Sequence, residues 1–543
     1  MKVKFVIFLV IVAICATVGL GSWGVTETSE ARYAEIGREI ISTHDFVHPN
    51  LLGIHHYHKP PVTYWLTALG YKIFGVNAFG ARFFLVVALI VQLILVYKIT
   101  LHLFKNEKIA FYSSVLYFSF PIVLISIRNL TTDAYLNTFA LSCMFFWISY
   151  LNTKKTYNIY LYFLFLGIGF LTKGPVILLP VFAFVILFRW FTKQKFKFTI
   201  HNILGFLGFL AISGSWFGLI IHDKPQLWSY FTQHQLADRM LNATSFHRNK
   251  PFWYYLWSAP LVGFPLAILI ALNFKKVYKN IIEVETKRIV KSLGLAVIVL
   301  LVLFSCFSSK LILYILPVYP LLAILGGYLF KQMNTTMLKY FIKIYLLLFA
   351  VLIVGGIWVI LNEKLNINTW LFFCWEIIAI GGCYSIIWYK KRTEKKQLLY
   401  MSMLFSCCLL LAYTLFAAEN PSVINSSRDL TSFINKHDLK KRKILVYNYL
   451  LPSLSFALEK DITTLNDGNY TTQRNIAFQS NLDYKQNYYD LSENGETERL
   501  ENTLAQMPCV LILSKKHSLN KKYKQFFNYF KNHEEVDKWI VYY

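Results

Sequence analysis

Acidic and basic side chains recur in the polar segments between the apolar stretches of this 543-residue chain. In one such segment Glu27 and Glu30 precede Arg32 and Tyr33, and Lys59 follows further on. Arginine binds phosphate through paired hydrogen bonds, and lysine binds it as a point charge. A carboxylate near such cations can act as a general base on a hydroxyl group. These residue types favour chemistry in which cations stabilise a leaving phosphate opposite a base.

The same residue types recur in further polar segments. These are His55-His56-Tyr57-His58-Lys59-Pro60-Pro61, Thr131-Thr-Asp133, Thr172-Lys173-Gly174-Pro175, Ser308-Ser309-Lys310 through Tyr314, and a loop with Arg239 and His247. Two alternatives stay open from the residues alone. Lysine and arginine near a span end also reach toward lipid headgroups without further function. Glu30 and Asp133 also suit the first turn or N-cap of a helix.

Composition places the chain among membrane proteins. It is 56% hydrophobic and only 15% charged, with a mean hydropathy of +0.45. A soluble core cannot bury that much apolar surface. The net charge of +26 comes from short basic clusters between apolar spans, which argues against a nucleic-acid-binding protein. The eight cysteines show no disulfide framework or paired metal motif.

About thirteen apolar spans are predicted from stretches of roughly 15 to 23 residues. Their centres lie near Val10, Val91, Val115, Phe145, Leu164, Phe182, Phe209, Phe264, Val299, Leu322, Leu348, Trp375 and Leu409. The first is interpreted as a retained helix, because it lacks a convincing signal-peptide cleavage site. Basic clusters occupy alternate connections, at residues 105–108, 154–155, 189–197, 275–291, 331–339 and 390–396. The positive-inside rule therefore predicts a cytoplasmic amino terminus and a carboxyl terminus on the outer face.

The predicted domains are a membrane domain over residues 1–416 and a small soluble α/β domain over residues 417–543. The membrane domain has outer loops at residues 23–79 and 222–252. The first loop is amphipathic, with two helices expected to lie on the membrane surface at residues 30–42 and 61–74. In the tail, helical stretches at residues 429–436, 496–507 and 521–532 alternate with strands at residues 444–449, 509–514 and 539–543.

The outer motifs resemble a known family. The runs Glu30-Ala-Arg32-Tyr33 and Tyr57-His58-Lys59-Pro60-Pro61 are similar to the first periplasmic loop of the lipid A aminoarabinose transferases. Leu171-Thr-Lys173-Gly-Pro175 and Lys310-Leu-Ile-Leu-Tyr314 follow in the family's order, and the resemblance covers roughly residues 1–330. The protein O-mannosyltransferases are more distantly similar. The resemblance implies a GT-C fold: mainly α, polytopic and transmembrane, with the α/β domain at its carboxyl end.

The resemblance also implies roles for individual residues. Arg32, Tyr33 and Lys59 match residues that hold the phosphate of a lipid-linked sugar donor. Lys310 and Tyr314 match a further part of that pocket, and Asp133 matches a carboxylate near the reacting centre. The predicted site consists of these residues and the charged residues named above, which fall into two groups. The catalytic candidates are Glu30, Asp133 and Glu27, and the substrate-binding candidates are Arg32, Tyr33, Lys59, Lys173, Arg239, Lys310 and Tyr314.

The chain departs from the family pattern at two positions. Ser29 stands where the family has an aspartate, which leaves Glu30 or Glu27 to supply the base. His58 stands where the family has a glutamate implicated in metal binding. His58 with His247 could still hold a divalent metal such as zinc, although the histidine spacing fits no ordinary zinc motif. No cofactor is otherwise expected.

The leading hypothesis is a glycosyltransferase of the cell inner membrane with a periplasmic active site. It would transfer a sugar from undecaprenyl phosphate to an acceptor such as lipid A, with inversion at the anomeric carbon. A protein or another envelope glycan is an alternative acceptor. A transporter or flippase of lipid-linked sugars is an alternative of another class. It is disfavoured because the sequence shows no repeated halves and its candidate residues gather on one face.

Overall fold

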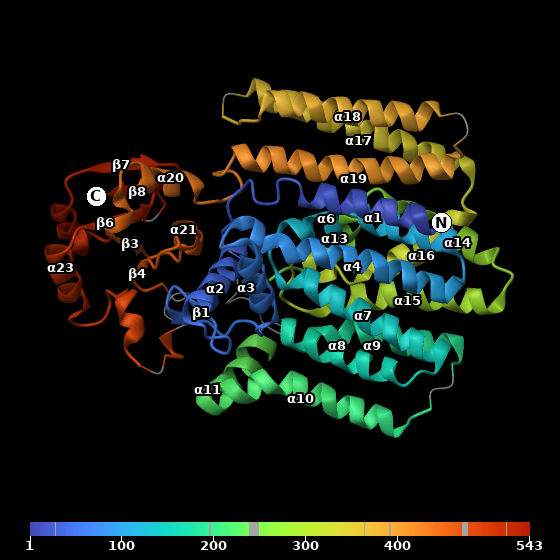
Figure 1. Cartoon of the computed structure of the whole chain (residues 1–543), viewed down its shortest axis with the longest axis horizontal. Coiled ribbons are helices and arrows are strands. Elements are labelled where there is room, and N and C mark those ends of the chain that lie inside the picture. The colour runs from blue at the N-terminus through green and yellow to red at the C-terminus, as the bar shows by residue number, and fades with distance from the viewer. Residues whose placement is uncertain are drawn as a thin grey trace. The chain divides into compact units, whose positions relative to one another are not determined.

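The computed structural model describes residues 1–27, 29–194, 197–237, 249–362, 364–389, 392–469, 476–479, 481–516 and 518–543 (Figure 1). The chain divides into two compact units. The helical unit comprises Met1–Leu20 and Phe83–Phe416, and the mixed unit comprises Gly21–Arg82 and Ala417–Tyr543. Each unit is therefore built from two separate stretches of the sequence.

Long apolar helices make up the helical unit. Its helices are α1 (Lys2–Thr17), α4 (Ala78–Phe104), α5 (Glu107–Phe118), α6 (Pro121–Arg128), α7 (Thr132–Thr153), α8 (Tyr157–Lys173), η1 (Gly174–Ile177), α9 (Leu178–Thr192), α10 (Ile200–Asp223), α11 (Gln226–Ser229), η2 (Tyr230–Ala237), α13 (Tyr254–Val262), α14 (Leu266–Lys279), α15 (Val284–Cys306), η4 (Ile312–Ile315), α16 (Val318–Gln332), α17 (Thr335–Leu361), α18 (Thr369–Trp388) and α19 (Glu394–Glu419). Within the described ranges, eight helices are long and apolar enough to cross a membrane, or ten if each bent pair forms one span.

The predicted count of thirteen spans is not confirmed. The helices at three of the predicted centres, α1, α5 and α16, have only 16, 12 and 15 residues. A fourth centre, Phe264, falls at the break between α13 and α14, where the chain bends by 103°. Two more centres, Leu164 and Phe182, fall in one apolar segment, Tyr157–Thr192, that counts as a single span. A helix of these lengths is shorter than the roughly 20 residues that cross a bilayer unaided. The chain is nevertheless a multi-pass membrane protein, as predicted.

Several of the basic segments that connect the helices lie close to one another, as contacts between helix ends show. The Lys395 Nζ donates a hydrogen bond to the Lys331 carbonyl at 2.6 Å, which joins the start of α19 to the end of α16. The Lys291 ammonium lies 4.8 Å from the centroid of the Phe191 ring, which joins the start of α15 to the end of α9. The amino terminus lies 3.7 Å from the Glu107 carboxylate at the start of α5. These ends belong to the connections that the sequence predicts on one side of the membrane.

The mixed unit contains a six-stranded sheet. Its strand order is β5-β4-β3-β6-β8-β7, with parallel pairing from β5 to β6 and antiparallel pairing among β6, β8 and β7. The strands are β3 (Lys443–Tyr447), β4 (Thr463–Asn466), β5 (Tyr488–Asp490), β6 (Cys509–Ser514), β7 (His533–Val536) and β8 (Trp539–Tyr542). The helices around it are α20 (Arg428–Lys436), η5 (Leu439–Lys441), α21 (Pro452–Leu458), η6 (Asp483–Gln486), α23 (Glu496–Gln506) and η7 (Lys521–Tyr529). The predicted α/β character of this region is confirmed, although the stretch from Lys521 is a 3-10 helix.

Two helices from the first loop share a core with this sheet. They are α2 (Ser29–Thr43) and α3 (Val62–Phe74), joined through a small hairpin of β1 (Asn50–Leu51) and β2 (Ile54–His55). Ile36 and Ile40 of α2 are buried in one cluster with Ile444 and Val446 of β3. Burial of such side chains contributes about 1.5 to 3 kcal/mol each. The first loop thus folds together with the carboxyl-terminal segment, while its predicted place on the membrane surface and the domain division at residue 416 stay predictions.

Candidate active site

Glu30 and Arg82 form a closed ion pair in the mixed unit. The Arg82 Nε and one terminal nitrogen donate to the two Glu30 carboxylate oxygens, each at 2.8 Å. Both side chains are completely buried. Arg82 also donates to the carbonyls of Trp23 and Gly24, and its guanidinium lies 4.4 Å from the centroid of the Trp23 ring. The backbone N–H and the hydroxyl of Thr26 both donate to Glu30 at 2.9 Å, so this carboxylate ties the segment before α2 to the helix and to the start of α4.

Glu27 has a different environment from Glu30. Its Oε1 accepts a hydrogen bond from the Ser453 backbone N–H at 2.8 Å. Its Oε2 is buried and has no hydrogen-bond donor among the residues that the structure describes. Burial raises the pKa of Glu27 to about 7, against the smaller opposing effects of Ser453 and of the charges of Arg32 and Lys538. Glu27 is therefore a carboxyl group that can change protonation near neutral pH.

The loop that carries Lys59 is held by a carboxylate of α2. Glu39 accepts hydrogen bonds from the Leu52 N–H at 2.5 Å and the Gly53 N–H at 3.1 Å. Gly53 has φ of +73°, and a Cβ at this position would lie 2.7 Å from the end of the Asn487 side chain, so glycine avoids both a strained backbone and a close contact in this turn. Burial, followed by the nearby Glu35 charge, raises the pKa of Glu39 well above its ordinary value. The turn between β1 and β2 therefore has a fixed shape just before His58 and Lys59, whose side chains are both half-buried.

Tyr33 and Arg32 lie on α2 close to the other candidates of the mixed unit. Both side chains are half-buried, and the Tyr33 ring lies 5.4 Å from that of Tyr64 on α3. Arg32 is near enough to Glu27 for its charge to lower the pKa of that carboxyl group. A glutamate, an arginine and a tyrosine thus occupy the first turns of α2 and the segment before it.

A second charged pair lies in the helical unit. The Lys173 ammonium, at the end of α8, lies 2.5 Å from an Asp133 carboxylate oxygen in the first turn of α7. Both side chains are largely buried, with 7% and 9% of their surfaces exposed. The other Asp133 oxygen accepts a hydrogen bond from the Thr131 hydroxyl at 3.2 Å. The same ammonium lies 4.2 Å from the centroid of the Tyr314 ring, so three predicted residues form one cluster.

Lys310 lies in the connection between α15 and η4. Its ammonium donates to the carbonyls of Phe307 at 2.5 Å and Lys250 at 2.9 Å. Only 3% of the residue is exposed, and burial lowers the pKa of Lys310 below its ordinary value. A bridge between Asn249 and Ser309 joins the same two segments. Lys310 therefore fixes the connection that leads to Tyr314.

The candidates fall into the two compact units. Glu27, Glu30, Arg32, Tyr33, His58 and Lys59 belong to the mixed unit, and Asp133, Lys173, Lys310 and Tyr314 belong to the helical unit. Arg239 and His247 lie outside the described residues. The ring centroids of His56 and His58 lie 3.8 Å apart. The described part of the chain contains no group of three or more His, Cys, Asp or Glu that could hold a metal. Because His247 lies outside the described residues, the metal site of His58 with His247 stays a prediction.

Sequence reasoning missed Arg82 and the carboxylates farther along α2. Arg38 of α2 donates to Glu35 at 2.7 Å and to Asp461 at 2.8 Å, and the Ser455 hydroxyl donates to Glu35 at 2.7 Å. An arginine at the start of the apolar stretch after residue 78 was a usable signal, because such a charge is costly unless it is paired. The partners in the carboxyl-terminal segment had no comparable signal.

Residues 58–216 match the profile of the family described as dolichyl-phosphate-mannose-protein mannosyltransferase. The chain also aligns over 99% of its length with the crystal structure of ArnT from Cupriavidus metallidurans bound to undecaprenyl phosphate. That alignment covers 97% of the ArnT chain with a TM-score of 0.77 and 18% sequence identity.

The chain has the GT-C fold. This agreement confirms the predicted fold class, and the structure of the same ArnT in its apo state matches with the same TM-score of 0.77 and 17% identity. Two proteins that are similar in sequence carry names of the same kind of transferase. An undecaprenyl phosphate-alpha-4-amino-4-deoxy-L-arabinose arabinosyl transferase of Photorhabdus laumondii is 28% identical over 374 residues, which is 67% of each chain. The enzyme of the same name from Aeromonas hydrophila is 30% identical over 305 residues, which is 54% of each chain.

The predicted resemblance to the aminoarabinose transferases is therefore confirmed. The chain spans about half to two thirds of the length of the curated relatives it matches. Asp133 and Lys173 both lie inside the 58–216 stretch that matches the mannosyltransferase profile. The GT-C resemblance thus includes the segment with the charged pair of the helical unit.

Proposed function

We propose that this protein is an inverting glycosyltransferase that moves a sugar from a polyprenyl phosphate, such as undecaprenyl phosphate, to a hydroxyl or phosphate acceptor such as lipid A. The observation that carries the proposal is the buried pair of Asp133 and Lys173 beside Tyr314. It combines a carboxylate with a cation in a partly closed setting, on a fold whose named relatives use lipid-phosphate sugars. Hydrogen-bonded cations aimed at a leaving phosphate suit such a transfer.

In the proposed reaction, the acceptor oxygen attacks the anomeric carbon of the donor sugar. The bond between that carbon and the phosphate oxygen breaks, and the phosphate retains the electron pair and its lipid. Asp133 takes the proton from the acceptor oxygen, and Lys173 stabilises the negative charge that grows on the phosphate. A single displacement of this kind inverts the anomeric configuration. The proposed reaction has no step that uses a metal.

The contributions of the mixed-unit candidates follow from their contacts. Glu30 is occupied on both oxygens by Arg82 and Thr26, which suits a structural role. Glu27 has one oxygen without a hydrogen-bond donor in the described part of the chain and a pKa of about 7, so it is the better candidate for proton transfer on that unit. Arg32, Tyr33 and Lys59 are proposed to bind the donor phosphate and sugar.

The proposed location is the inner membrane, with the Asp133 end of the helical unit facing the periplasm. Alternating basic connections support this orientation. Cysteines introduced one at a time, as Lys59→Cys and Lys287→Cys, test it in intact cells with a membrane-impermeant maleimide. The orientation predicts labelling at position 59 and protection at position 287, while the reverse pattern contradicts it.

Reconstitution tests the reaction itself. Purified protein in liposomes is given a panel of radiolabelled polyprenyl-phosphate sugars with lipid A, envelope glycans or unfolded periplasmic proteins as acceptors. The proposal predicts transfer from at least one donor, with an inverted product linkage determined by NMR. Absence of transfer from every donor, or a product with retained configuration, contradicts it.

A protein acceptor is a second candidate, because the matched family is described as a protein mannosyltransferase. The lipid and protein acceptors are distinguished by which molecule receives the radiolabelled sugar. Lipid A masses compared between cells with and without the gene report a lipid acceptor, and labelled protein bands in the reconstituted assay report a protein acceptor.

A further inference from the structure

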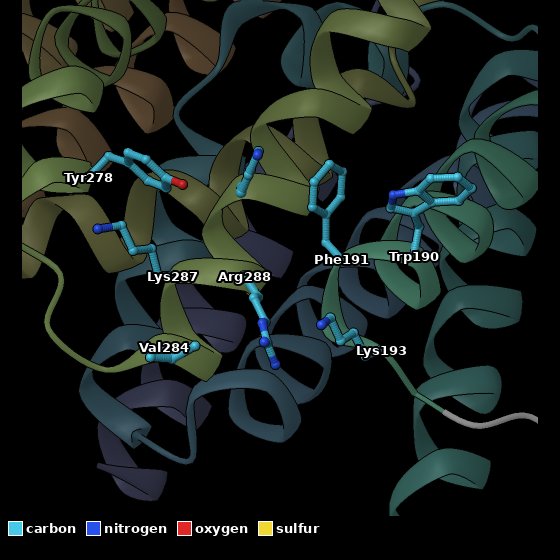
Figure 2. Close-up of a pocket in the computed structure, with 8 residues that line it drawn as sticks. Trp190, Phe191, Lys193, Tyr278, Val284, Lys287 and Arg288 are labelled. Carbon is cyan, nitrogen blue, oxygen red and sulfur yellow. The ribbon is translucent and has the colours of Figure 1, made fainter.

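A basic pocket lies at the far end of the helical unit from Asp133. It has a volume of about 350 Å³ and is formed by the end of α9, the end of α14 and the start of α15 (Figure 2). Figure 2 shows Trp190, Phe191 and Lys193 on one side of it and Tyr278, Val284 and Lys287 on the other, with Arg288 between them. No candidate residue for sugar transfer contributes to this pocket.

The pocket concentrates positive charge. Four of its lining residues are cationic, and they are Lys193, Lys287, Arg288 and Lys291. None of the lining residues is acidic, and no ion pair joins these four side chains to a carboxylate within the described residues. Lys287 and Lys291 are four residues apart on α15, and like charges at that spacing destabilise a helix. An anion in the pocket would remove this repulsion.

Two acidic residues lie near the pocket but do not line it. Glu283, at the N-cap of α15, accepts a hydrogen bond from the Thr286 hydroxyl at 2.6 Å, and Glu285 lies in the first turn of the same helix. The partial positive charge at the start of α15 favours these carboxylates as well as a bound anion. The charged side chains that line the cavity itself are all cationic.

Aromatic and apolar groups surround the cations. The Lys287 ammonium lies 5.4 Å from the centroid of the Tyr278 ring, and the Lys291 ammonium lies 4.8 Å from that of Phe191. Trp190 and Val284 are 77% and 61% exposed. Exposed tryptophan beside a span end is typical of the interface between lipid chains and headgroups. A ligand with a phosphate and an attached apolar part matches both features.

We propose that this pocket binds the phosphate of an anionic phospholipid, with Arg288, Lys291 and Lys193 on the headgroup and Trp190 and Val284 against its chains. Arginine offers paired hydrogen bonds to phosphate oxygens, and basic pockets between transmembrane helices bind such headgroups. Free inorganic phosphate has the same anionic chemistry but no apolar part. The site is separate from the proposed sugar transfer and stands without it.

The test uses the full-length protein in nanodiscs with photoreactive lipid analogues, and mass spectrometry maps the labelled peptides. A phosphatidylglycerol analogue is expected to label the ends of α9 and α14 and the start of α15, and a phosphatidylcholine analogue is not. The double variant Arg288→Gln with Lys291→Gln should lose that labelling by about tenfold or more, because two headgroup cations are gone. Added inorganic phosphate should leave the labelling unchanged.

The matched control is Lys275→Gln with Lys276→Gln. These two exposed lysines lie on α14 at the same end of the bundle but do not line the pocket, so their loss removes the same charge from the surface alone. Labelling by phosphatidylglycerol should stay within about twofold of the natural protein. Lys193→Gln tests the same pocket without changing α15, should the double variant fail to fold.

Three results would overturn the assignment. Equal losses in the pocket and control variants would show only a general attraction of the basic end to lipid. Equal labelling by the zwitterionic analogue would show no selection for charge. Displacement of the lipid by inorganic phosphate would show that the pocket takes the free anion instead.

Discussion

Two buried ion pairs, Glu30 with Arg82 and Asp133 with Lys173, differ in how completely their carboxylates are occupied. Arg82 holds both oxygens of Glu30, and Thr26 adds two further donors. Lys173 contacts one oxygen of Asp133, and the only hydrogen bond to the other oxygen within the described residues comes from the Thr131 hydroxyl at 3.2 Å. Glu30 is completely buried, whereas both members of the second pair retain some exposure.

This difference distinguishes a carboxylate with a structural role from one that is available for a reaction. A carboxylate held at two points by a buried arginine cannot accept a proton or move without breaking a network of strong bonds. A carboxylate held at one point by a flexible lysine can exchange that partner for a substrate phosphate or hydroxyl. We therefore propose that Glu30 serves the folding of the mixed unit and that Asp133 serves the reaction.

Loss of the Lys173 charge should have the largest effect. Lys173→Met should lower kcat by about 10²- to 10³-fold, because the cation proposed to stabilise the leaving phosphate is removed. Lys173→Arg should recover part of that activity. The control is Tyr314→Phe, which keeps the ring beneath the ammonium and should stay within about threefold of the natural rate. Near-natural turnover by Lys173→Met in the liposome assay would place the reaction elsewhere.

Loss of the Arg82 charge should instead affect stability. Arg82→Met leaves Glu30 buried without its partner, which should cost about 3 to 5 kcal/mol in the free energy of unfolding. The double variant Arg82→Met with Glu30→Gln should recover much of that stability, because no unpaired charge remains. Thermal unfolding of the purified protein measures both. A loss of less than about 1 kcal/mol would show that the pair behaves like a solvent-screened one.

The pKa of Glu27 predicts a pH-dependent stability. Its pKa is about 7 in the folded protein and ordinarily 4.5, so the folded state binds the proton more tightly. This contribution is fully present below pH 4.5 and is lost as the pH rises through about 7, with an expected size of about 3 kcal/mol. Thermal unfolding across that range should show this slope in the natural protein and a smaller one in Glu27→Gln.

The matched control for Glu27 is Glu459→Gln, because Glu459 is an exposed glutamate of the same unit. It should keep the slope of the natural protein. An identical slope in Glu27→Gln and the natural protein would rule out Glu27 as its source.

The Glu39 contacts predict a smaller and local effect. Glu39→Gln replaces one of the two acceptor oxygens that hold the Leu52 and Gly53 N–H groups, which should cost about 1 to 3 kcal/mol in local stability. Hydrogen exchange should become faster at residues 50–55, and KM for the donor should rise severalfold because the Lys59 loop is less ordered. Ser42→Ala, on the same helix, is the control. Unchanged exchange in Glu39→Gln would show that the loop is held by other contacts.

The sequence could predict features that depend on local pattern. Apolar stretches located the long helices, and the strand at residues 509–514 was recognised from its run of β-favouring residues. Asp133 and Lys173 were both predicted as site residues because charged residues at span ends are costly. Their contact with each other was not predicted, since nothing in the sequence specifies which span ends touch.

Features that depend on distant pairing could not be predicted. Arg82 and Glu30 are 52 residues apart, and their side-chain geometry appears only after folding. The amphipathic pattern of α2 fits a membrane surface and a protein core equally well. The sequence therefore could not predict that Ile36 and Ile40 pack in one buried cluster with Ile444 of β3. The hold of Glu39 on the turn at Gly53 depends on the same tertiary arrangement.

The most direct test compares Asp133→Asn and Glu30→Gln in one single-turnover transfer assay, with rates normalised to the folded fraction of each protein. Each substitution removes one carboxylate charge and keeps the side-chain shape. The account predicts that Asp133→Asn lowers the rate by about 10²- to 10⁴-fold, while folded Glu30→Gln stays within about fivefold of the natural rate. A near-natural rate for Asp133→Asn together with a collapsed rate for Glu30→Gln would contradict it.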